Sequence, residues 1–340
     1  MRIMIFLLLG FALLAPAPAT AEQLQAIKRR GALNCGVNGG LPGFSAPDAE
    51  GVMRGLDADL CRAVAAAILG DATKVNFLRQ PSPGAGFGAL GEGRIDLLAR
   101  NTTWTYLRET MQGVTAAGIA LLDGQGLLVP AASPVNAFRD LAGRRICVAD
   151  RAGLETDDII LAEAARRGIE VELVEAGPGP ALLATLAGGR CDAATADFFQ
   201  LAIRKATEMA TPADWRLLPE LLSREPLALF VRTGEETLRE VVFWTVQALK
   251  EAEELGVTRD NLVEQVQAND PAVRRLVGIE PGLGSALGLE DSWSQQAIAA
   301  VGNYGEIFAR NLGTASPFGL DRGLNDNWQR GGLVFPLPLR

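Results

Sequence analysis

The chain has 340 residues, of which 48% are hydrophobic and 21% charged, which is typical of a globular protein long enough for two cores. It contains no histidine, which excludes Ser-His-Asp and Cys-His catalysis and every histidine metal site. The net charge of -8 argues against a nucleic-acid-binding protein.

The first 21 residues have the pattern of a cleaved signal peptide. Arg2 precedes a short apolar run at residues 3–14, and Ala19-Thr20-Ala21 forms an A-x-A cleavage site. The apolar run is shorter than the ~20 residues that cross a bilayer, which disfavours an uncleaved membrane anchor. We therefore expect export and a mature chain that starts at Glu22.

Export changes the interpretation of the four cysteines. Cys35, Cys61, Cys147 and Cys191 show no C-x-x-C spacing, so a zinc site is disfavoured, and an oxidising compartment favours disulfides. Of the three possible connectivities, the spacing favours Cys35–Cys61 and Cys147–Cys191, each within one region. Free, buried thiols that pack as small hydrophobes are the alternative.

In chain order, short β-like runs alternate with amphipathic helical stretches, which is the pattern of parallel α/β construction. The first unit has predicted strands at 33–37, 75–78 and 95–99. A helix is predicted from about Asp57 to a stop at Gly70, and a short one at 87–90.

A second unit follows residues 123–126. Strands are predicted at 127–129, 145–148, 171–174 and 191–194, and helices at 137–141, 154–167, 180–186 and 198–209. After an apolar run at 227–231 we expect a helix at 235–254 and a mostly helical remainder through 293–310 and 320–328, with breaks at 278–288 and 313–319.

No phosphate-binding, dinucleotide-binding, zinc-protease or calcium-loop motif is present, so neither a cofactor nor a metal is expected. The informative segment is 96–108, where a buried-type strand leads into Asn101 and Thr103, flanked by Arg100 and Arg108. Open α/β sheets bind ligands at the carboxyl ends of their strands, and a guanidinium binds a carboxylate bidentately. The alternative is a loop whose arginines pair with surface acids.

Four segments in this order resemble the periplasmic general L-amino-acid-binding proteins of ABC transporters. They are GGLPGFS at 39–45, GLDADLCRAVAAA at 55–67, RNTTWT at 100–105 and VGNYGEIF at 301–308. The resemblance covers nearly all of the mature chain, and all four cysteines lie in matching contexts.

The resemblance implies an α/β two-domain periplasmic binding protein fold of type II, with two hinge strands and a helical C-terminal extension. Residues 22–123 and 225–340 would form domain 1 and residues 124–224 domain 2, with crossings near 122–126 and 225–229. An amino acid or related zwitterion would be enclosed in the interdomain cleft by hinge closure and delivered to an inner-membrane ABC permease. A periplasmic, monomeric protein without enzyme activity is implied.

The resemblance also implies the roles of individual residues. Arg108 would grip the α-carboxylate of the ligand, assisted by Asn101 and Thr103, and Asp197 would receive the α-ammonium. Arg100 would remain as additional positive charge for an acidic side chain. Because these are guanidinium and carboxylate groups, we expect their charges to be fixed at neutral pH.

Three places depart from the family pattern. The segment at 196–200 keeps the aspartate of relatives at Asp197 but adds bulk after it. The loop at 149–155 has no hydroxyl where relatives carry several, so the backbone amides of Ala152 and Gly153 and the side chain of Arg151 would have to replace them, while Asp150 would repel a carboxylate. Leu41 stands where the wider family has an aromatic residue. We therefore expect a ligand specificity different from that of the general amino-acid-binding proteins.

Two other functions remain open at this point. The altered loop is compatible with a binding protein that serves a sensor or has drifted to an unrelated small molecule. A periplasmic lyase of the cyclohexadienyl-dehydratase type would reuse the same fold, with Glu155 or Asp150 as general acid.

Overall fold

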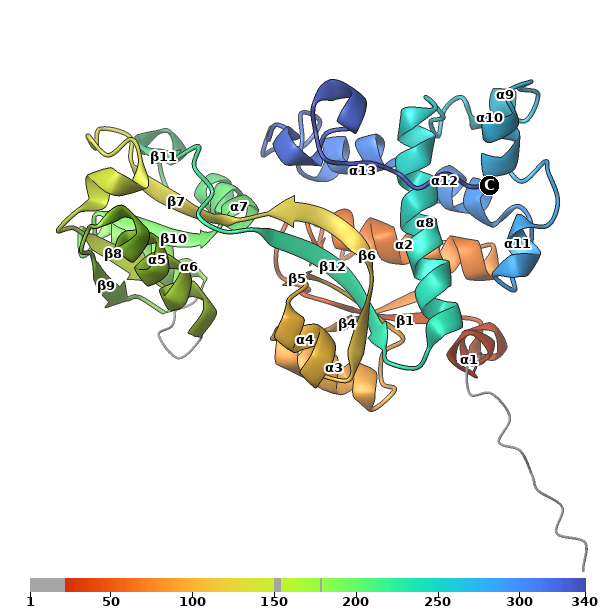
Figure 1. The fold of residues 1–340 in the computed structure, drawn as a ribbon, viewed down its shortest axis with the longest axis horizontal. Coiled ribbons are helices and arrows are strands. Elements are labelled where there is room, and N and C mark those ends of the chain that lie inside the picture. The colour runs from red at the N-terminus through yellow and green to blue at the C-terminus, as the bar shows by residue number, and fades with distance from the viewer. Residues whose placement is uncertain (1–21, 150–153, 178) are drawn as a thin grey trace, which may run out of the picture.

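The computed structural model describes residues 22–149, 154–177 and 179–340 and contains two α/β domains, each built on a five-stranded sheet (Figure 1). The predicted two-domain α/β fold is therefore confirmed. The signal-peptide segment 1–21 lies outside the described residues.

The first sheet has the order β4-β1-β5-β12-β6. Its first three strands are parallel, whereas β12 is antiparallel to both of its neighbours. The strands are β1 (Leu33–Val37), β4 (Val75–Arg79), β5 (Leu97–Thr103), β6 (Val114–Asp123) and β12 (Glu225–Arg232), and β2 (Ala46–Pro47) with β3 (Met53–Arg54) forms a separate short pair.

Helices cover both faces of this sheet. Helices α2 and α8 pack on one face, and α3 and α4 pack on the other (Figure 1). The helices of this domain before the extension are α1 (Glu22–Arg30), α2 (Leu56–Leu69), α3 (Pro83–Gly91), α4 (Tyr106–Met111) and α8 (Glu236–Glu254).

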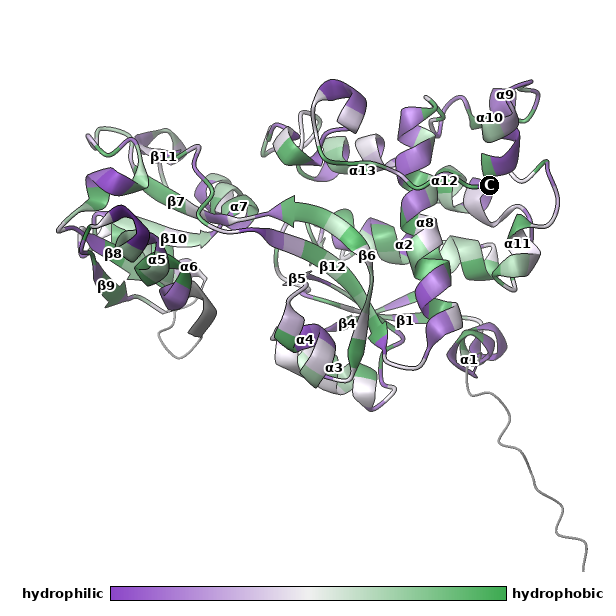
Figure 2. Cartoon of the chain, in the orientation of Figure 1, coloured by the Kyte–Doolittle hydropathy of each residue, from purple (hydrophilic) through white to green (hydrophobic). Residues whose placement is uncertain are grey.

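The alternation of side chains along β12 shows why residues 227–231 of the strand are all apolar. Leu227, Leu229 and Val231 point into the core that contains α2 and α8, whereas Ala228 and Phe230 pack with the α3 side. Successive side chains of a strand point to opposite faces, so a strand covered on both faces needs a continuous apolar run. Figure 2 shows the corresponding hydrophobic colouring along β12 and β6.

The second sheet has the order β11-β7-β10-β8-β9. Its strands are β7 (Gln125–Pro130), β8 (Arg145–Val148), β9 (Glu172–Glu175), β10 (Ala193–Asp197) and β11 (Trp215–Leu217). Its helices are α5 (Leu154–Arg167), α6 (Pro180–Ala187) and α7 (Phe198–Glu208).

Two chain segments connect the domains. Strand β6 ends at Asp123 and β7 begins at Gln125, so the first passage is direct, and the chain returns into the first sheet at Glu225 (Figure 1). Glu225 pairs with Asp123, so the two passages lie side by side. Such a pair of adjacent connecting strands is suited to hinge motion.

The C-terminal extension packs on the first domain. Helix α12 lies against α2, and charged pairs anchor the extension: Arg310 contacts Asp59 at 2.8 Å and Arg322 contacts Glu253 at 3.0 Å. The extension contains α9 (Leu262–Gln265), α10 (Pro271–Leu276), α11 (Leu283–Ala286), α12 (Trp293–Val301) and α13 (Tyr304–Asn311).

Several sequence predictions of elements were incomplete. Helix α1 and strand β6 were not predicted, because α1 is too short to show a clear period and β6 is rich in alanine and glycine, which have little strand preference. Strand β5 continues to Thr103 rather than ending at Ala99, because β12 pairs with its polar end. The segment 320–328 is not a regular helix but contains short 3₁₀ turns.

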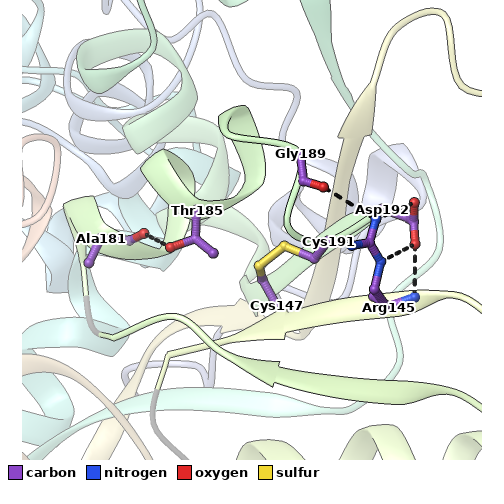
Figure 3. The surroundings of a disulfide bond; sticks show 7 residues. All are labelled: Arg145, Cys147, Ala181, Thr185, Gly189, Cys191 and Asp192. Carbon is purple, nitrogen blue, oxygen red and sulfur yellow. Dashed lines mark hydrogen bonds and ion pairs between the residues drawn. A yellow bond between two sulfur atoms is a disulfide. The ribbon is translucent and has the colours of Figure 1, made fainter.

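The structure joins Cys35 to Cys61 and Cys147 to Cys191, as the spacing favours, with Cα–Cα distances of 6.2 and 5.6 Å. Each bond lies within one domain. Figure 3 shows the second bond between β8 and the start of the β10 segment, beside the ion pair of Arg145 with Asp192 at 3.3 Å. The bond and the ion pair together fix the same two neighbouring strands.

In the parts of the chain that the structure describes, no helix combines the length and the apolar character that a membrane span requires.

We expect the Cys147–Cys191 bond to stabilise the second domain. Replacing both cysteines by alanine should lower the free energy of unfolding by about 2–5 kcal/mol, because the unfolded chain gains the freedom that the cross-link removes. Urea denaturation measures this. Thr185→Ala, which removes one exposed hydrogen bond within α6 near the disulfide, is the control and should cost under about 1 kcal/mol. Equal effects of the two changes would contradict the prediction.

Candidate functional site

A cavity of about 520 Å³ lies between the two domains. Its walls come from the carboxyl ends of β4 and β5 and from α4 on one side, and from β7, β10, α6 and α7 on the other. The lining side chains are mostly polar: Asn38, Arg79, Pro81, Pro83, Arg100, Asn101, Thr102, Thr103, Arg108, Gln125, Ile159, Gly179, Pro180, Asp197, Gln200, Arg204 and Glu225.

A bulge in β5 forms the part of this wall that carries Arg100 and Asn101. The pairing with β12 passes from Thr102 opposite Ala228 to Ala99 opposite Leu229, so Arg100 and Asn101 have no partner on β12. A bulge of this kind bends the strand and redirects side chains. It turns the polar end of an otherwise buried strand toward the cavity.

The bulge has an unusual backbone at its second residue. Asn101 has a φ of 41° and is the non-glycine residue with positive φ in the described parts of the chain. This region is costly for residues with a side chain, although asparagine tolerates it better than most. The side-chain oxygen of Asn101 accepts a hydrogen bond from Asn38 at 3.2 Å.

Asp57 holds this backbone in place from the first turn of α2. Its carboxylate accepts a hydrogen bond from the backbone N–H of Asn101 at 3.0 Å, and its side chain is buried. Burial raises the pKa of Asp57 to about 7, although the hydrogen bond from Asn101 and the charge of Arg100 act in the opposite direction. The aspartate is therefore a positioning residue for the cavity wall.

The guanidinium of Arg100 donates hydrogen bonds to backbone carbonyls of the same domain. Its Nε donates to the carbonyl of Gln80 at 2.9 Å and its Nη2 to the carbonyl of Pro81 at 3.0 Å. Burial lowers the pKa of this guanidinium, while the nearby Asp57 favours its charged form. Arg100 thus ties the end of β5 to the segment after β4 and also contributes positive charge to the cavity.

Arg108 lies on α4, whose first turn is capped by Thr105. Its Nη1 donates to the carbonyl of Thr103 at 2.8 Å, which aligns the guanidinium beside the end of β5. Arg108 also lines the cavity, as do Thr102 and Thr103, and a guanidinium carries several N–H donors. This set of donors suits a carboxylate.

Asp197 lies on the opposite wall, at the last position of β10 directly before α7. The pKa of the neighbouring Asp123 is raised well above its usual value, mainly by burial. The charges of Asp197 and Glu225 raise this pKa further. Among the described residues of the second domain that line the cavity, Asp197 is the carboxylate.

The structure therefore brings five of the sequence-predicted site residues to one cavity: Arg100, Asn101, Thr103, Arg108 and Asp197. Leu41 is not among the lining residues and packs in the core of the first domain. Leu41 is buried and pairs with Ser45 across the turn that precedes β2. Gly153, with the rest of the loop 150–153, lies outside the described residues.

Several residues that line the cavity were not predicted from the sequence. Arg79 ends β4 and Gln125 begins β7, so each lies at a strand end facing the cleft, and Arg204 comes from α7. For Arg79 the strand end was a usable signal, because parallel strands present their carboxyl ends at one edge. Gln125 instead lies at the amino end of β7, which is antiparallel to β10, so it faces Asp197 only once the two strands are paired. Arg204 had no such signal, since an arginine on an amphipathic helix is usually solvated.

Among the described residues there is no group of three or more cysteine, aspartate or glutamate side chains arranged to hold a metal ion.

A family model and the sequences of known proteins match this chain, and all of them describe solute-binding proteins. The model for bacterial extracellular solute-binding proteins, family 3, matches residues 33–261. A glutamate/glutamine/aspartate/asparagine-binding protein of Rhodobacter capsulatus is 40% identical over 334 residues, which cover 97% of each protein. A general L-amino acid-binding periplasmic protein of Rhizobium johnstonii is 39% identical over 336 residues, covering 98% of this chain and 97% of that one.

Among solved structures, an ABC transporter periplasmic binding protein from Brucella ovis with glutathione bound superposes with a TM-score of 0.86. It is 41% identical, and the match covers 93% of this chain and 99% of the other. The similarity includes the C-terminal extension, which lies beyond the part matched by the family model.

The raised pKa of Asp57 gives a prediction about stability and pH. The pKa of this group is 3.8 in its reference state and about 7 when folded, so the folded protein holds the proton more tightly. The contribution of Asp57 to the free energy of unfolding therefore falls as pH rises through this range. Asp57→Asn should remove that fall. The free energy of unfolding of the variant, relative to that of the parent, should therefore rise by at most about 4 kcal/mol between acidic and alkaline pH.

Thermal and urea unfolding at both ends of this pH range measure the difference. Asp71→Asn is the control, because hydrogen bonds from Thr73 lower the pKa of the exposed Asp71 and its contribution has the opposite sign. A difference between parent and Asp57→Asn that does not change with pH would contradict the prediction.

Proposed function

Because the chain belongs to the family 3 bacterial extracellular solute-binding proteins, we propose that it captures an amino acid or a related zwitterion in the cleft between its domains and delivers it to an inner-membrane ABC permease. The observation that carries the proposal is the position of Arg108 and Asp197, which line one cavity from different domains. A zwitterion requires a cation on one side and an anion on the other, and this cavity offers both.

In this proposal Arg108 binds the ligand α-carboxylate. Its guanidinium is aligned by the carbonyl of Thr103, and the hydroxyls of Thr102 and Thr103 lie beside it. Charged hydrogen bonds to a carboxylate are stronger than neutral ones, and a fork of parallel donors fixes its orientation. Asn101 is held at the same wall by its bonds to Asp57 and Asn38.

Asp197 binds the ligand α-ammonium. It lies at the junction of β10 and α7, beside the passage from β6 to β7. A ligand that bridges Arg108 and Asp197 contacts both domains at once, so its binding energy favours the closed arrangement. Residues 22–123 and 225–340 would move against residues 124–224 as the two rigid parts, with the hinge at Asp123–Gln125 and Glu225.

Among the described residues that line it, the cavity carries more positive than negative charge. Arg79, Arg100, Arg108 and Arg204 line it, against Asp197 and Glu225. This excess favours a ligand with an additional carboxylate, as in the glutamate and aspartate named for the Rhodobacter capsulatus relative or the glutathione of the Brucella ovis structure. We therefore place acidic amino acids and acidic peptides of this size first among the ligands.

The proposed setting is the periplasm, with the first 21 residues removed as a signal peptide and the protein acting as a monomer. We expect no catalytic turnover, since the family and the named relatives are binding proteins. Conversion of prephenate or arogenate by the purified protein would contradict this and favour the lyase alternative.

Arg108→Ala should weaken binding of the preferred ligand at least about tenfold, because the carboxylate loses its charged donor. Asp197→Asn should weaken it similarly by removing the partner of the ammonium. Titration calorimetry over a panel of amino acids, with glutamate and glutathione included, measures both changes.

Arg94→Ala is the matched control, because Arg94 pairs with Glu92 on the exposed surface of the same domain and does not line the cavity. It should leave ligand affinity unchanged. Unchanged affinity in Arg108→Ala and in Asp197→Asn would overturn the assignment of the site.

A further inference from the structure

A second cavity of about 270 Å³ lies behind the connecting strand β6, where α8, α13 and the C-terminal segment pack against it. The described residues that line it all differ from those that line the interdomain cavity. Its walls are largely apolar and aromatic, and Trp104, Phe243, Tyr304 and Phe335 contribute rings. Trp104 and Phe335 are partly exposed, at 39% and 61%, so the cavity is open to solvent at this side.

A buried lysine contributes the main charge of this cavity. Lys250 projects from α8, and its side chain is 8% exposed. Its Nζ donates to the carbonyl of Ile119 at 2.9 Å and lies 5.4 Å from the centre of the Tyr304 ring. An ammonium has three donors, and within the described residues Lys250 forms no ion pair.

The acidic residues nearest to Lys250 along α8 are engaged elsewhere. Glu253 pairs with Arg322 at 3.0 Å, Glu251 accepts from the backbone N–H of Leu339 at 3.2 Å, and Glu254 accepts from the indole of Trp328 at 2.7 Å. None of these carboxylates lines the cavity.

The described residues of this lining therefore include two cations, Lys250 and Arg239, and no carboxylate. Arg239 is paired with Glu236 at 2.9 Å, so among these two described cations Lys250 is the one without an ion pair. A buried charge without a partner is costly, and an anion that enters the cavity relieves this cost. Burial lowers the pKa of Lys250 to about 8, so the amine still carries its proton at neutral pH.

We propose that this cavity is a second binding site, for a small amphipathic monoanion that has an apolar or aromatic body and a single carboxylate. Lys250 binds the carboxylate, and the rings of Phe243, Tyr304 and Phe335 enclose the body. A zwitterionic amino acid is disfavoured, because the cavity offers no anion to receive its ammonium. The site is separate from the proposed amino-acid site and does not depend on it.

Titration calorimetry with 3-phenylpropanoate tests the proposal on the purified protein. We expect saturable binding at up to millimolar concentration, and little binding of the neutral 3-phenylpropanamide. Binding should persist in Arg108→Ala, because that variant alters only the interdomain cavity. Absence of saturable binding, equal binding of the amide, or loss of binding in Arg108→Ala would overturn the proposal.

Lys250→Met provides the decisive variant, since it keeps the apolar stem and removes the charge. It should weaken 3-phenylpropanoate binding about ten- to hundredfold while leaving binding in the interdomain cleft unchanged. Lys74→Met, at an exposed lysine away from the cavity, is the control and should have no effect.

Phe335→Ala covers the case in which Lys250→Met does not fold. Phe335 is largely exposed, so its truncation leaves the core intact, and it should still weaken binding by removing part of the apolar wall. Unchanged affinity in either folded variant would contradict the assignment.

Discussion

The pairing of β12 with both β5 and β6 is the constraint on which the rest of the structure depends. On one side, the break in register against β5 leaves Arg100 and Asn101 outside the ladder and turns them toward the interdomain cavity. On the other side, the pairing with β6 holds Glu225 opposite Asp123, so the two passages between the domains run together. One returning strand thus shapes a wall of the cleft and its hinge, and it leaves the other edge of β6 to line the second cavity.

Burial, rather than residue type, determines which groups titrate near neutrality. A chain without histidine is expected to keep fixed charges around pH 7. Asp57 is an exception, because its burial beneath the bulge raises its pKa to about 7. Lys250 is a second exception, because burial lowers its pKa to about 8. Both groups lie against the backbone of strands that lead to the hinge or the cleft, so protonation and strand geometry are linked.

The sequence predicted the regular elements well where hydrophobic periodicity was strong. The strand at 33–37 and the helix at 154–167 have the predicted bounds, because an apolar pattern at one period specifies the element locally. Strand β6 was not predicted, because its alanines and glycine have little strand preference and its conformation depends on pairing with β12. Arg204 and Asp57 were not predicted as site residues for a related reason. Each lies on a helix, and its role becomes visible only when the helix is packed against the cavity or against the bulge at Asn101.

The two-domain α/β class, the favoured cysteine pairing and the choice of Arg108, Thr103 and Asp197 as candidate ligand groups could be predicted from the sequence, because each depends on local pattern, spacing or a motif. Three features could be seen only in the folded chain: Arg100 donates to backbone carbonyls, Leu41 packs in the core, and Lys250, which has no ion pair among the described residues, lines a second cavity. These outcomes depend on which side chains meet across elements far apart in the chain, and no local pattern encodes such contacts.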